Sequence, residues 1–408
     1  MRTAKLKDIT LTITDGKHGD CKNHDGSGYY FISCKDVYDE TIHYENARQI
    51  AEDDFRDADR RTNLAAYDIL ITNSGTIGRM ALVKDIPETR KTTFQKSVAI
   101  VRADTSQVVP NYLYYLLKSK VHDFINSSNG SAQKNLLLST MRDFDISFVD
   151  SFETQHRIAT ILSRYDSLIE NYQKQIKLLE EAAQRLYKEW FVDLHFPGHE
   201  NTNIIDGVPE GWEKKTIDDV TCKITTGLNP RKNFVLGKGS NYYVTIKNMA
   251  DNTLFLDDRC DRVDNEALEK INKRSDLKIG DILFSGIGTI GRVALVYIPT
   301  NNWNVSESVF TLRANDIVTK EFLYLMLLSP DMQNYCQSNA HGAAQKGIRM
   351  ADLKAYSFNL PPFGVIQKFT NLVTPTIKKV SSIRNQIRLL TEARDRLLPK
   401  LMSGEIAV

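Results

Sequence analysis

The 408-residue sequence repeats itself once, and this duplication limits its fold more than any other feature. Residues 68–83 (DILITNSGTIGRMALV) return as 281–296 (DILFSGIGTIGRVALV), and 130–134 (GSAQK) return as 342–346 (GAAQK). The apolar run 112–117 matches 322–327, and 176–186 (IKLLEEAAQRL) matches 387–397 (IRLLTEARDRL). All four matches keep their order at one nearly constant spacing. This spacing is far longer than the ~20–50 residues of a solenoid repeat, so it indicates a duplicated domain-plus-helix unit.

The segments between these matches look unrelated, as residues 15–59 and 225–264 illustrate. The sequence therefore predicts two copies of one framework that carry different inserts.

The first copy ends in a long helix, because residues 153–191 contain neither Pro nor Gly. Ser151 is the expected N-cap, and Pro197 and Gly198 lie past the end. At 1.5 Å per residue the helix would be roughly 55–60 Å long. Steps of four and three separate its apolar residues, which is the a/d heptad pattern of a coiled coil. These residues are Ile158, Leu162, Tyr165, Ile169, Tyr172, Ile176, Leu179, Ala183, Leu186 and Trp190.

The second copy carries a similar stripe in the same phase, interrupted by Thr376 and Arg394. Pro375 is expected to kink this helix or delay its start, which leaves a regular helix from Thr376 to about Met402. Each stripe could simply be core for its own globular domain. An a/d-only stripe is narrower than that role requires, so pairing between the two helices is favoured. The stripe consists of Phe369, Val373, Val380, Ile383, Ile387, Leu390, Leu397 and Leu401.

The expected fold class is α+β, with two globular mixed α/β domains separated by two long antiparallel coiled-coil helices. Antiparallel pairing would relate the two copies by a pseudo-two-fold axis. The expected divisions are residues 1–150 and 199–362 for the globular domains, 151–198 for the central helix and 363–408 for the distal helix.

Two motifs resemble sites of nucleotide chemistry. Gly286-Ile-Gly288-Thr-Ile-Gly291 spells the dinucleotide fingerprint, but that motif needs a helix after it, and the following residues are strand-like. A strand–turn–strand is therefore favoured. Asn359-Leu-Pro-Pro-Phe363 resembles the N-P-P-F loop of adenine methyltransferases, but Leu360 breaks its spacing and no Gly-rich S-adenosylmethionine loop accompanies it. A rigid lead into the second helix is favoured.

The sequence predicts no catalytic, metal or cofactor site. Eight histidines show no metal-binding spacing, and the five cysteines form no C-x-x-C pair. Scattered cysteines suit a reducing cytoplasm, and neither a secretion signal nor a run of ~20 apolar residues is present. A cytoplasmic protein without membrane contact is expected.

Net charge is only +2, which gives no support for nucleic-acid binding but leaves room for local basic faces. Polar and basic loops are the remaining candidates for contact with DNA, since Gln pairs well with adenine and Lys with guanine or phosphate. Solvated loops are the alternative, although the repeated Gln-Lys pair favours function or a shared framework turn. The candidates in the inserts are Lys17, His18, Lys22, Lys35, Thr226, Asn229, Arg231, Lys232, Lys247 and Asn248. Those in the repeated turns are Ser74, Thr76, Arg79, Gln133, Lys134, Ser285, Thr289, Arg292, Gln345 and Lys346.

Taken in order, these motifs resemble the specificity subunits of type I restriction–modification systems over nearly the whole chain. The resemblance rests on 29–33 (YYFIS), the two D-I-L-x-x-x-x-G-T-I-G-R turns, 130–134, 155–159 (QHRIA), 186–191 (LYKEWF) and 208–212 (VPEGW). One departure is 365–369 (VIQKF), which lacks the acidic residue often found before the Gln.

The resemblance implies a chain without catalysis of its own. Residues 1–150 and 199–362 would be target-recognition domains that each read one half of a split double-stranded DNA target. The helices would set the spacer and dock two methyltransferase subunits, which bind S-adenosylmethionine and methylate adenine at N6. Two restriction (translocase) subunits, which use ATP and Mg, can join such complexes. The helix seam is expected at Ile158, Leu162, Ile169, Ile176, Leu179, Leu186, Trp190, Ile383, Ile387, Leu390 and Leu397.

Two other readings stay open. One is an enzyme that uses a nucleotide at Gly286–Gly291, and the other is a duplicated coiled-coil adaptor with no nucleic-acid role, which the near-neutral charge favours.

Overall fold

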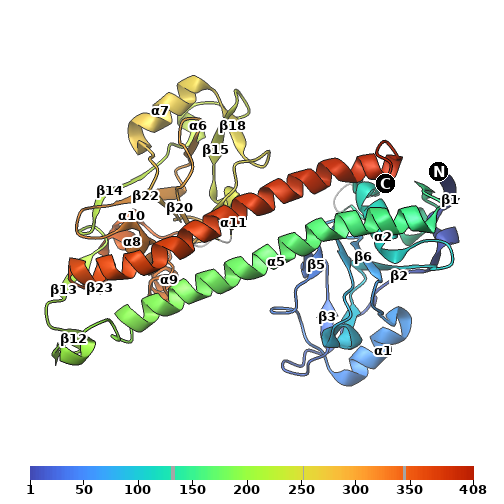
Figure 1. Ribbon diagram of the computed structural model, residues 1–408, viewed down its shortest axis with the longest axis horizontal. Helices are drawn as coiled ribbons and strands as arrows, with labels where there is room; N and C mark the ends of the chain where they lie inside the picture. Colours follow the sequence, from blue (N-terminus) through green and yellow to red (C-terminus); the bar gives the residue numbers. More distant parts are fainter. Residues whose placement is uncertain (130–133, 251, 343–345) are drawn as a thin grey trace. The chain divides into compact units, whose positions relative to one another are not determined.

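The computed structural model describes residues 1–129, 134–250, 252–342 and 346–408. The chain forms two compact units, Met1–Asn171 with Ile387–Val408 and Tyr172–Gln386. Each unit contains one globular domain together with part of the two long helices, α5 (Phe152–Phe191) and α11 (Phe363–Ser403) (Figure 1).

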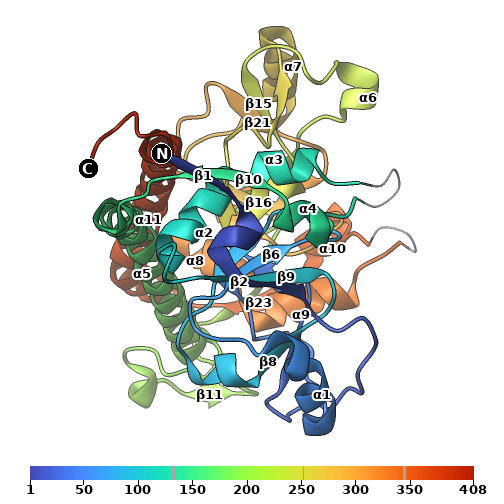
Figure 2. The same cartoon turned by 90° about the vertical axis from the view of Figure 1, so that its right-hand side faces the viewer.

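The first globular domain is built on the four-stranded antiparallel sheet β2-β9-β6-β7 (Figure 2). Smaller pairs join β1 to β10, β3 to β8 and β4 to β5. The strands are β1 (Arg2–Lys5), β2 (Thr10–Asp15), β3 (Tyr30–Ile32), β4 (Val37–Tyr38), β5 (Thr41–Ile42), β6 (Ile69–Thr72), β7 (Met80–Leu82), β8 (Thr92–Phe94), β9 (Val98–Ala103) and β10 (Asp145–Phe148). The helices are α1 (Glu52–Thr62), α2 (Pro110–Ser119), α3 (Val121–Asn126) and α4 (Leu138–Arg142).

The second globular domain repeats this arrangement around the sheet β14-β22-β19-β20. Its strands are β11 (Ile204–Ile205), β12 (Val208–Pro209), β13 (Glu213–Thr216), β14 (Thr221–Thr226), β15 (Asn241–Val244), β16 (Met249–Ala250), β17 (Thr253–Leu254), β18 (Asp261–Val263), β19 (Ile282–Ser285), β20 (Val293–Leu295), β21 (Trp303–Val305), β22 (Val309–Ala314) and β23 (Ser357–Leu360). Its helices are α6 (Pro230–Asn233), α7 (Asn265–Ser275), α8 (Lys320–Leu327), α9 (Pro330–Ser338) and α10 (Met350–Ala355).

Strand β6 of the first sheet and strand β19 of the second are apolar on both faces, because both faces of each sheet are covered. Successive side chains of a strand point to opposite faces. Ile69 and Ile71 of β6 therefore join the core beneath α2, while Leu70 joins a second core with Ile32 of the insert and Phe94 of β8. This two-sided burial explains why the D-I-L motif carries a continuous apolar run.

The expectation that only the framework repeats is wrong for the backbone. Strands β3 and β15 each run parallel to an equivalent partner, β8 and β21, and each insert contains a short hairpin, β4–β5 or β16–β17. Helices α1 and α7 both end at a left-handed residue, Asn63 (φ 40°) and Asp276 (φ 43°). The two inserts differ in their surface residues, whereas a small set of buried positions maintains the same backbone in both.

In the first unit, α5 and α11 run antiparallel and share the core of the globular domain. Ile158 and Leu162 of α5 are buried with Leu398 and Leu401 of α11 in the cluster that contains α2. The Ser151 hydroxyl accepts the Thr154 N–H at 3.3 Å, which confirms the predicted N-cap.

In the second unit the same two helices again run antiparallel. Arg384 of α11 pairs with Glu180 of α5, and further along, Phe369 packs against Trp190 and Phe191. The helix stripes therefore serve both interpretations of the sequence, since they pair with each other and also complete the domain cores. Of the predicted seam, Ile158, Leu162, Ile169, Trp190 and Ile383 are buried, whereas Ile176, Leu179, Leu186, Ile387, Leu390 and Leu397 are half-buried.

The expected delay of the second helix at Pro375 is wrong, because α11 is already helical from Phe363. Pro375 removes the hydrogen bond to the carbonyl of Asn371, but both residues are exposed, so water can satisfy that carbonyl. On the opposite face, Phe369, Val373 and Ile377 are buried in the domain core, and their packing maintains the helix through the proline.

Gly286–Gly291 forms the expected turn between β19 and β20, with no helix after it, which contradicts the dinucleotide interpretation. Gly286 is required by packing, since an added Cβ would lie 2.5 Å from the Phe310 ring. The equivalent residues in the first domain are Asn73 and the small Ala99, so the larger residue on one strand accompanies a smaller one on the other.

Residues Pro361 and Pro362 directly precede α11, as expected for a rigid lead into that helix. Among the described residues, no helix combines the length and apolarity needed to cross a lipid bilayer.

Candidate nucleic-acid interface

The turn between β6 and β7 is a tight, Gly-rich loop closed by a hydroxyl. The Thr72 Oγ1 accepts the Arg79 N–H at 2.9 Å and also bonds the Thr76 carbonyl. Gly75 and Gly78 have φ of 78° and 89°, a backbone region that favours glycine. In the second domain Ser285 plays the part of Thr72, with its Oγ 2.8 Å from the Arg292 N.

A second loop, distant in sequence, lies on each of these turns. In the first domain Ser74 forms a backbone bridge with Asn135, and the Leu136 N–H donates to the Asn73 carbonyl at 2.8 Å. In the second domain the Gly288 N–H donates to the Lys346 carbonyl at 2.7 Å. The Gly-rich turn of each copy therefore forms one composite surface with residues at the end of the second motif or directly after it, which are Asn135 and Leu136 in the first domain and Lys346 in the second.

Several predicted contact residues are exposed on this composite surface. Thr76, Arg79 and Lys134 are exposed in the first domain, and Thr289 and Lys346 are exposed in the second, while Ser74 is half-buried. Within the described ranges, the side chains of Arg79, Lys134 and Lys346 have no ion-pair partner, so their charges are available to a phosphate or base. Gln133 and Gln345 lie outside the described residues.

The basic residues of the first insert are less uniform. Lys17 is half-buried and pairs with Asp57 at 2.9 Å, a hydrogen bond that raises the pKa of the lysine. His18 is exposed and lies 3.0 Å from the buried Asp15 carboxylate. Lys22 and Lys35 are exposed. Part of the positive charge here is therefore already neutralised by α1.

In the second insert, Arg231, Lys232 and Lys247 are exposed, but the polar candidates beside them have structural partners. The Asn229 side chain caps α6 and donates to Glu307 at 2.8 Å. Asn248 and Thr226 are buried, and Asn248 accepts the Thr245 N–H at 2.9 Å.

Ser285 and Arg292 are also occupied by the fold. The Ser285 hydroxyl closes its turn, and the Arg292 guanidinium donates to the Ile246 carbonyl at 2.9 Å and to the Met249 carbonyl. The side chains of Ser285, Arg292 and Asn229 are therefore bonded within the fold, and Thr226 and Asn248 are buried, so none of the five belongs to the exposed surface.

The aspartate of each D-I-L motif anchors the strand that carries the turn. Asp68 is 1% exposed and pairs in bidentate fashion with Arg102 (2.7 and 2.7 Å), and Asp281 does the same with Arg313 (2.7 and 2.9 Å). Each also accepts a backbone N–H three residues upstream at 2.8 Å. Such charge-assisted, geometrically fixed pairs position a strand end accurately.

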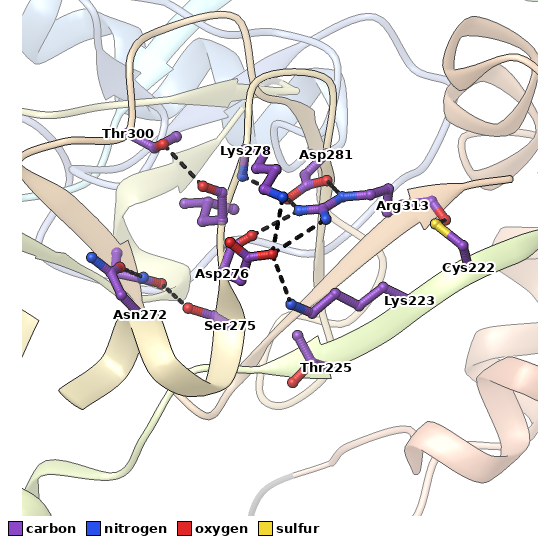
Figure 3. A network of polar contacts seen from close by, with 12 residues as sticks. Cys222, Lys223, Thr225, Asn272, Ser275, Asp276, Lys278, Asp281, Thr300 and Arg313 are labelled. Carbon is purple, nitrogen blue, oxygen red and sulfur yellow. Dashed lines mark hydrogen bonds and ion pairs between the residues drawn. The ribbon is translucent and has the colours of Figure 1, made fainter. Parts of the chain in front are cut away.

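The second anchor has an additional acidic neighbour, Asp276, which contacts Arg313 at 3.5 Å and Lys278 at 3.2 Å (Figure 3). The hydrogen bond with Lys278 lowers the pKa of Asp276. Its equivalent in the first domain is Asn63, whose backbone carbonyl accepts from Arg102 at 2.6 Å.

Three exposed residues beside the turns, Asn129, Asn135 and Arg349, were not among those predicted from the sequence. Asn135 forms backbone bridges with both Asn129 and Ser74, and Arg349 follows Ile348, whose N–H donates to the Gly286 carbonyl at 2.8 Å. The asparagines that flank residues 130–134 were a usable signal, because Asn pairs well with adenine.

No group of three or more His, Cys, Asp or Glu side chains in the described part of the chain is arranged to hold a metal ion. The arrangement instead presents amide, hydroxyl and cationic groups on turns, which suits recognition of a polar surface.

The family model "Type I restriction modification DNA specificity domain" matches the chain twice, at residues 3–181 and 209–387. The type I restriction enzyme MjaIX specificity subunit of Methanocaldococcus jannaschii is 30% identical over 347 residues, covering 83% of this chain and 78% of the relative. The HindI specificity subunit of Haemophilus influenzae is 24% identical over 374 residues, covering 75% and 80%.

A solved structure, the type I restriction–modification S subunit from M. genitalium, has the same fold. It has a TM-score of 0.58 at 17% identity and covers 98% of this chain and 96% of that one. The chain therefore belongs to the type I restriction–modification specificity subunits, a non-catalytic family that determines the DNA specificity of its complex while the methylase and restriction activities reside in other subunits.

Proposed function

We propose that each globular domain reads one half of a bipartite DNA target through the composite surface formed by its Gly-rich turn and the loop that lies on it. One observation carries this proposal: in both domains the Gly-rich turn contacts residues at the end of the second repeated motif or directly after it, yet the two domains differ in the residues exposed there. Arg79 is exposed in the first domain, whereas its equivalent Arg292 is occupied by backbone carbonyls. Equal frameworks with unequal surfaces fit two readers of different half-sites.

The proposed contact residues are the exposed ones. Their amide and cationic groups match base edges and phosphates, which are the two classes of contact that specific DNA readers make. They are Lys22, Lys35, Thr76, Arg79, Asn129, Lys134 and Asn135 in the first domain, and Arg231, Lys232, Lys247, Thr289, Lys346 and Arg349 in the second. His18, Lys17, Ser74, Gln133 and Gln345 remain predictions of the sequence.

Methylation mapping tests this function most directly. The chain is expressed with its methyltransferase partner in a host without such a system, and N6-methyladenine is located by long-read sequencing. We expect one bipartite motif with a fixed spacer, which disappears when this chain is omitted. A motif that persists without the chain, or one that is continuous, contradicts the proposal.

Exchange of residues 1–150 for those of a relative then assigns the half-sites. Since each domain has its own sheet and core, the exchange is expected to change one half-site and leave the other and the spacer as they were. A change in both half-sites contradicts independent reading.

We further propose that the helices dock two methyltransferase subunits, one on each copy of the repeat. Leu178 and Leu389 occupy equivalent positions of the repeat, and both are exposed, at 65% and 49%. Repetition of an exposed apolar residue fits two equivalent partner surfaces. S-adenosylmethionine would then belong to these partners, and ATP and Mg to any restriction subunits that join.

Single substitutions separate the two docking sites. Leu178→Asp and Leu389→Asp are each expected to reduce the bound methyltransferase from two copies to one, as measured by light scattering of the purified complex. Leu11→Asp, at a residue of β2 that is also 65% exposed, is the matched control. Full assembly of both helix variants contradicts the assignment.

A further inference from the structure

The distal helix carries one buried charge where its seam should be apolar. Arg394 is only 6% exposed, and its guanidinium pairs with Asp166 of α5 at 2.6 Å and with Glu40 at 2.8 Å. Burial alone would lower the pKa of Arg394, but the carboxylates of Glu40, Asp166 and the adjacent Asp395 more than offset it, so its pKa lies above the ordinary value. The arginine is therefore a permanently charged group inside the first unit.

Glu40 reaches this site from the first globular domain. It lies in the turn of the β4–β5 hairpin, where it also pairs with Lys118 of α2 at 2.5 Å and accepts a hydrogen bond from the Tyr114 hydroxyl at 3.3 Å. Asp39 and Glu40 both have positive φ (47° and 61°), a conformation that is unfavourable for residues other than glycine. The turn thus places the Glu40 carboxylate within reach of both Lys118 and Arg394.

The hairpin is close to the proposed DNA surface. Strands β4 and β5 contact β7, which begins directly after Arg79 and ends the Gly-rich turn. A displacement of the hairpin would therefore be transmitted to the turn that presents Thr76 and Arg79.

The second unit has a related contact at a different position of the repeat. Arg384 of α11 pairs with Glu180 of α5 at 2.6 Å and donates to the carbonyl of Asn252, in the turn of the β16–β17 hairpin, at 2.9 Å. The positions that correspond to Arg394 and Asp166 are Ala183 and Ile377, and both are buried in the apolar core of the second unit. In both units an arginine of α11 therefore joins α5 to the turn of the insert hairpin, and in the first unit the pairing of the helices at this position does not by itself require an ion pair.

We propose that Arg394 is a positioning residue for DNA recognition: it fastens the β4–β5 hairpin to the paired helices and so fixes the orientation of the first recognition domain. The proposal rests on the bipartite reading described above. Without the ion pair between Arg394 and Glu40, the domain keeps its own DNA-contact residues but can rotate relative to the helices. Half-site sequence is then unchanged, whereas the tolerated spacer between half-sites widens.

The most specific variant removes only the contact between Arg394 and the hairpin. Glu40→Gln keeps the shape of the side chain and leaves the Arg394–Asp166 pair between the helices intact. Arg396→Met, at an exposed residue of the same helix, is the matched control. The double variant Asp166→Ile/Arg394→Ala installs the apolar pair found in the second unit, so it removes the contact with the hairpin without leaving a lone buried charge.

The test is methylation mapping of each variant complex, because a genome samples all spacers. We expect the wild type and Arg396→Met to modify a single spacer. Glu40→Gln and the double variant are expected to modify the same half-sites also at spacers one base pair shorter or longer, at melting temperatures within about 2 °C of wild type.

Three results would bear differently on the two proposals. A single unchanged spacer in the folded Glu40→Gln complex overturns the positioning role of Arg394. Loss of methylation at all spacers to the same degree, as simple destabilisation would give, also overturns it. Absence of any bipartite motif in the wild type instead refutes the proposed function and leaves the variants without meaning for DNA.

Discussion

Arg79 and Arg292 occupy the same position of the repeat, but the structure predicts opposite effects of their removal. The Arg79 guanidinium is exposed, so Arg79→Ala is expected to leave the free energy of unfolding within about 0.5 kcal/mol of wild type. Arg292 is half-buried and donates to the carbonyls of Ile246 and Met249. Each charge-assisted bond contributes ~1.5–3 kcal/mol when buried, and partial exposure reduces this, so we expect Arg292→Ala to cost about 2 kcal/mol.

The effects on DNA binding are expected to be reversed. If Arg79 contacts a phosphate, its loss removes one released counterion, so the slope of log K against log salt falls by about 0.9. At 0.1 M salt this corresponds to about an eightfold weaker affinity. Arg292→Ala should leave the slope unchanged, because that side chain makes no contact with DNA.

Fluorescence anisotropy of the complex with its mapped target duplex, over a range of salt concentrations, measures the slope. Thermal unfolding of the same preparations measures stability. An unchanged slope for Arg79→Ala refutes its proposed phosphate contact. Unchanged stability for Arg292→Ala refutes the reasoning that its backbone bonds support the second domain.

Three further predictions concern stability, thiol chemistry and helix length. Asp68→Ala should lower the free energy of unfolding, measured in urea, by about 3 kcal/mol. Asp281→Ala should lower it by less, because Arg313, which loses its partner, still has Asp276 at 3.5 Å; an equal loss in the two variants would contradict this. Burial raises the pKa of Cys336 to about 12. Its neutral thiol should therefore resist an aromatic disulfide reagent at pH 8 while the exposed Cys222 reacts, and the stability gained from its burial is present below about pH 9 and falls as pH rises towards 12. Seven residues inserted into both α5 and α11 should lengthen the mapped spacer, and a constant spacer would refute the idea that the helices measure it.

Local sequence was sufficient for the elements whose signals are local. The run Asp68–Thr72 predicts a buried strand because its apolar residues are continuous, and the glycines that follow predict a turn. Ser151 marks the start of α5 because its hydroxyl caps the first turn. The duplication itself predicted that the same α+β fold would occur twice.

The sequence did not predict features that depend on packing between distant segments. Pro375 lies within α11 because buried neighbours on the opposite face stabilise the helix through it. The two inserts share a backbone despite unrelated residues, since only a few buried positions define it.

The candidate site shows the same division between local and distant information. Sequence identified the turn that carries Arg79 and the loop that contains Lys134, because both motifs recur. Only the tertiary structure brings them together, through a backbone bridge between Ser74 and Asn135, which are far apart in the chain. Arg79 is exposed and Arg292 is bonded, because backbone carbonyls of the insert lie within reach of Arg292. Spacing along the chain contains no information about that distance.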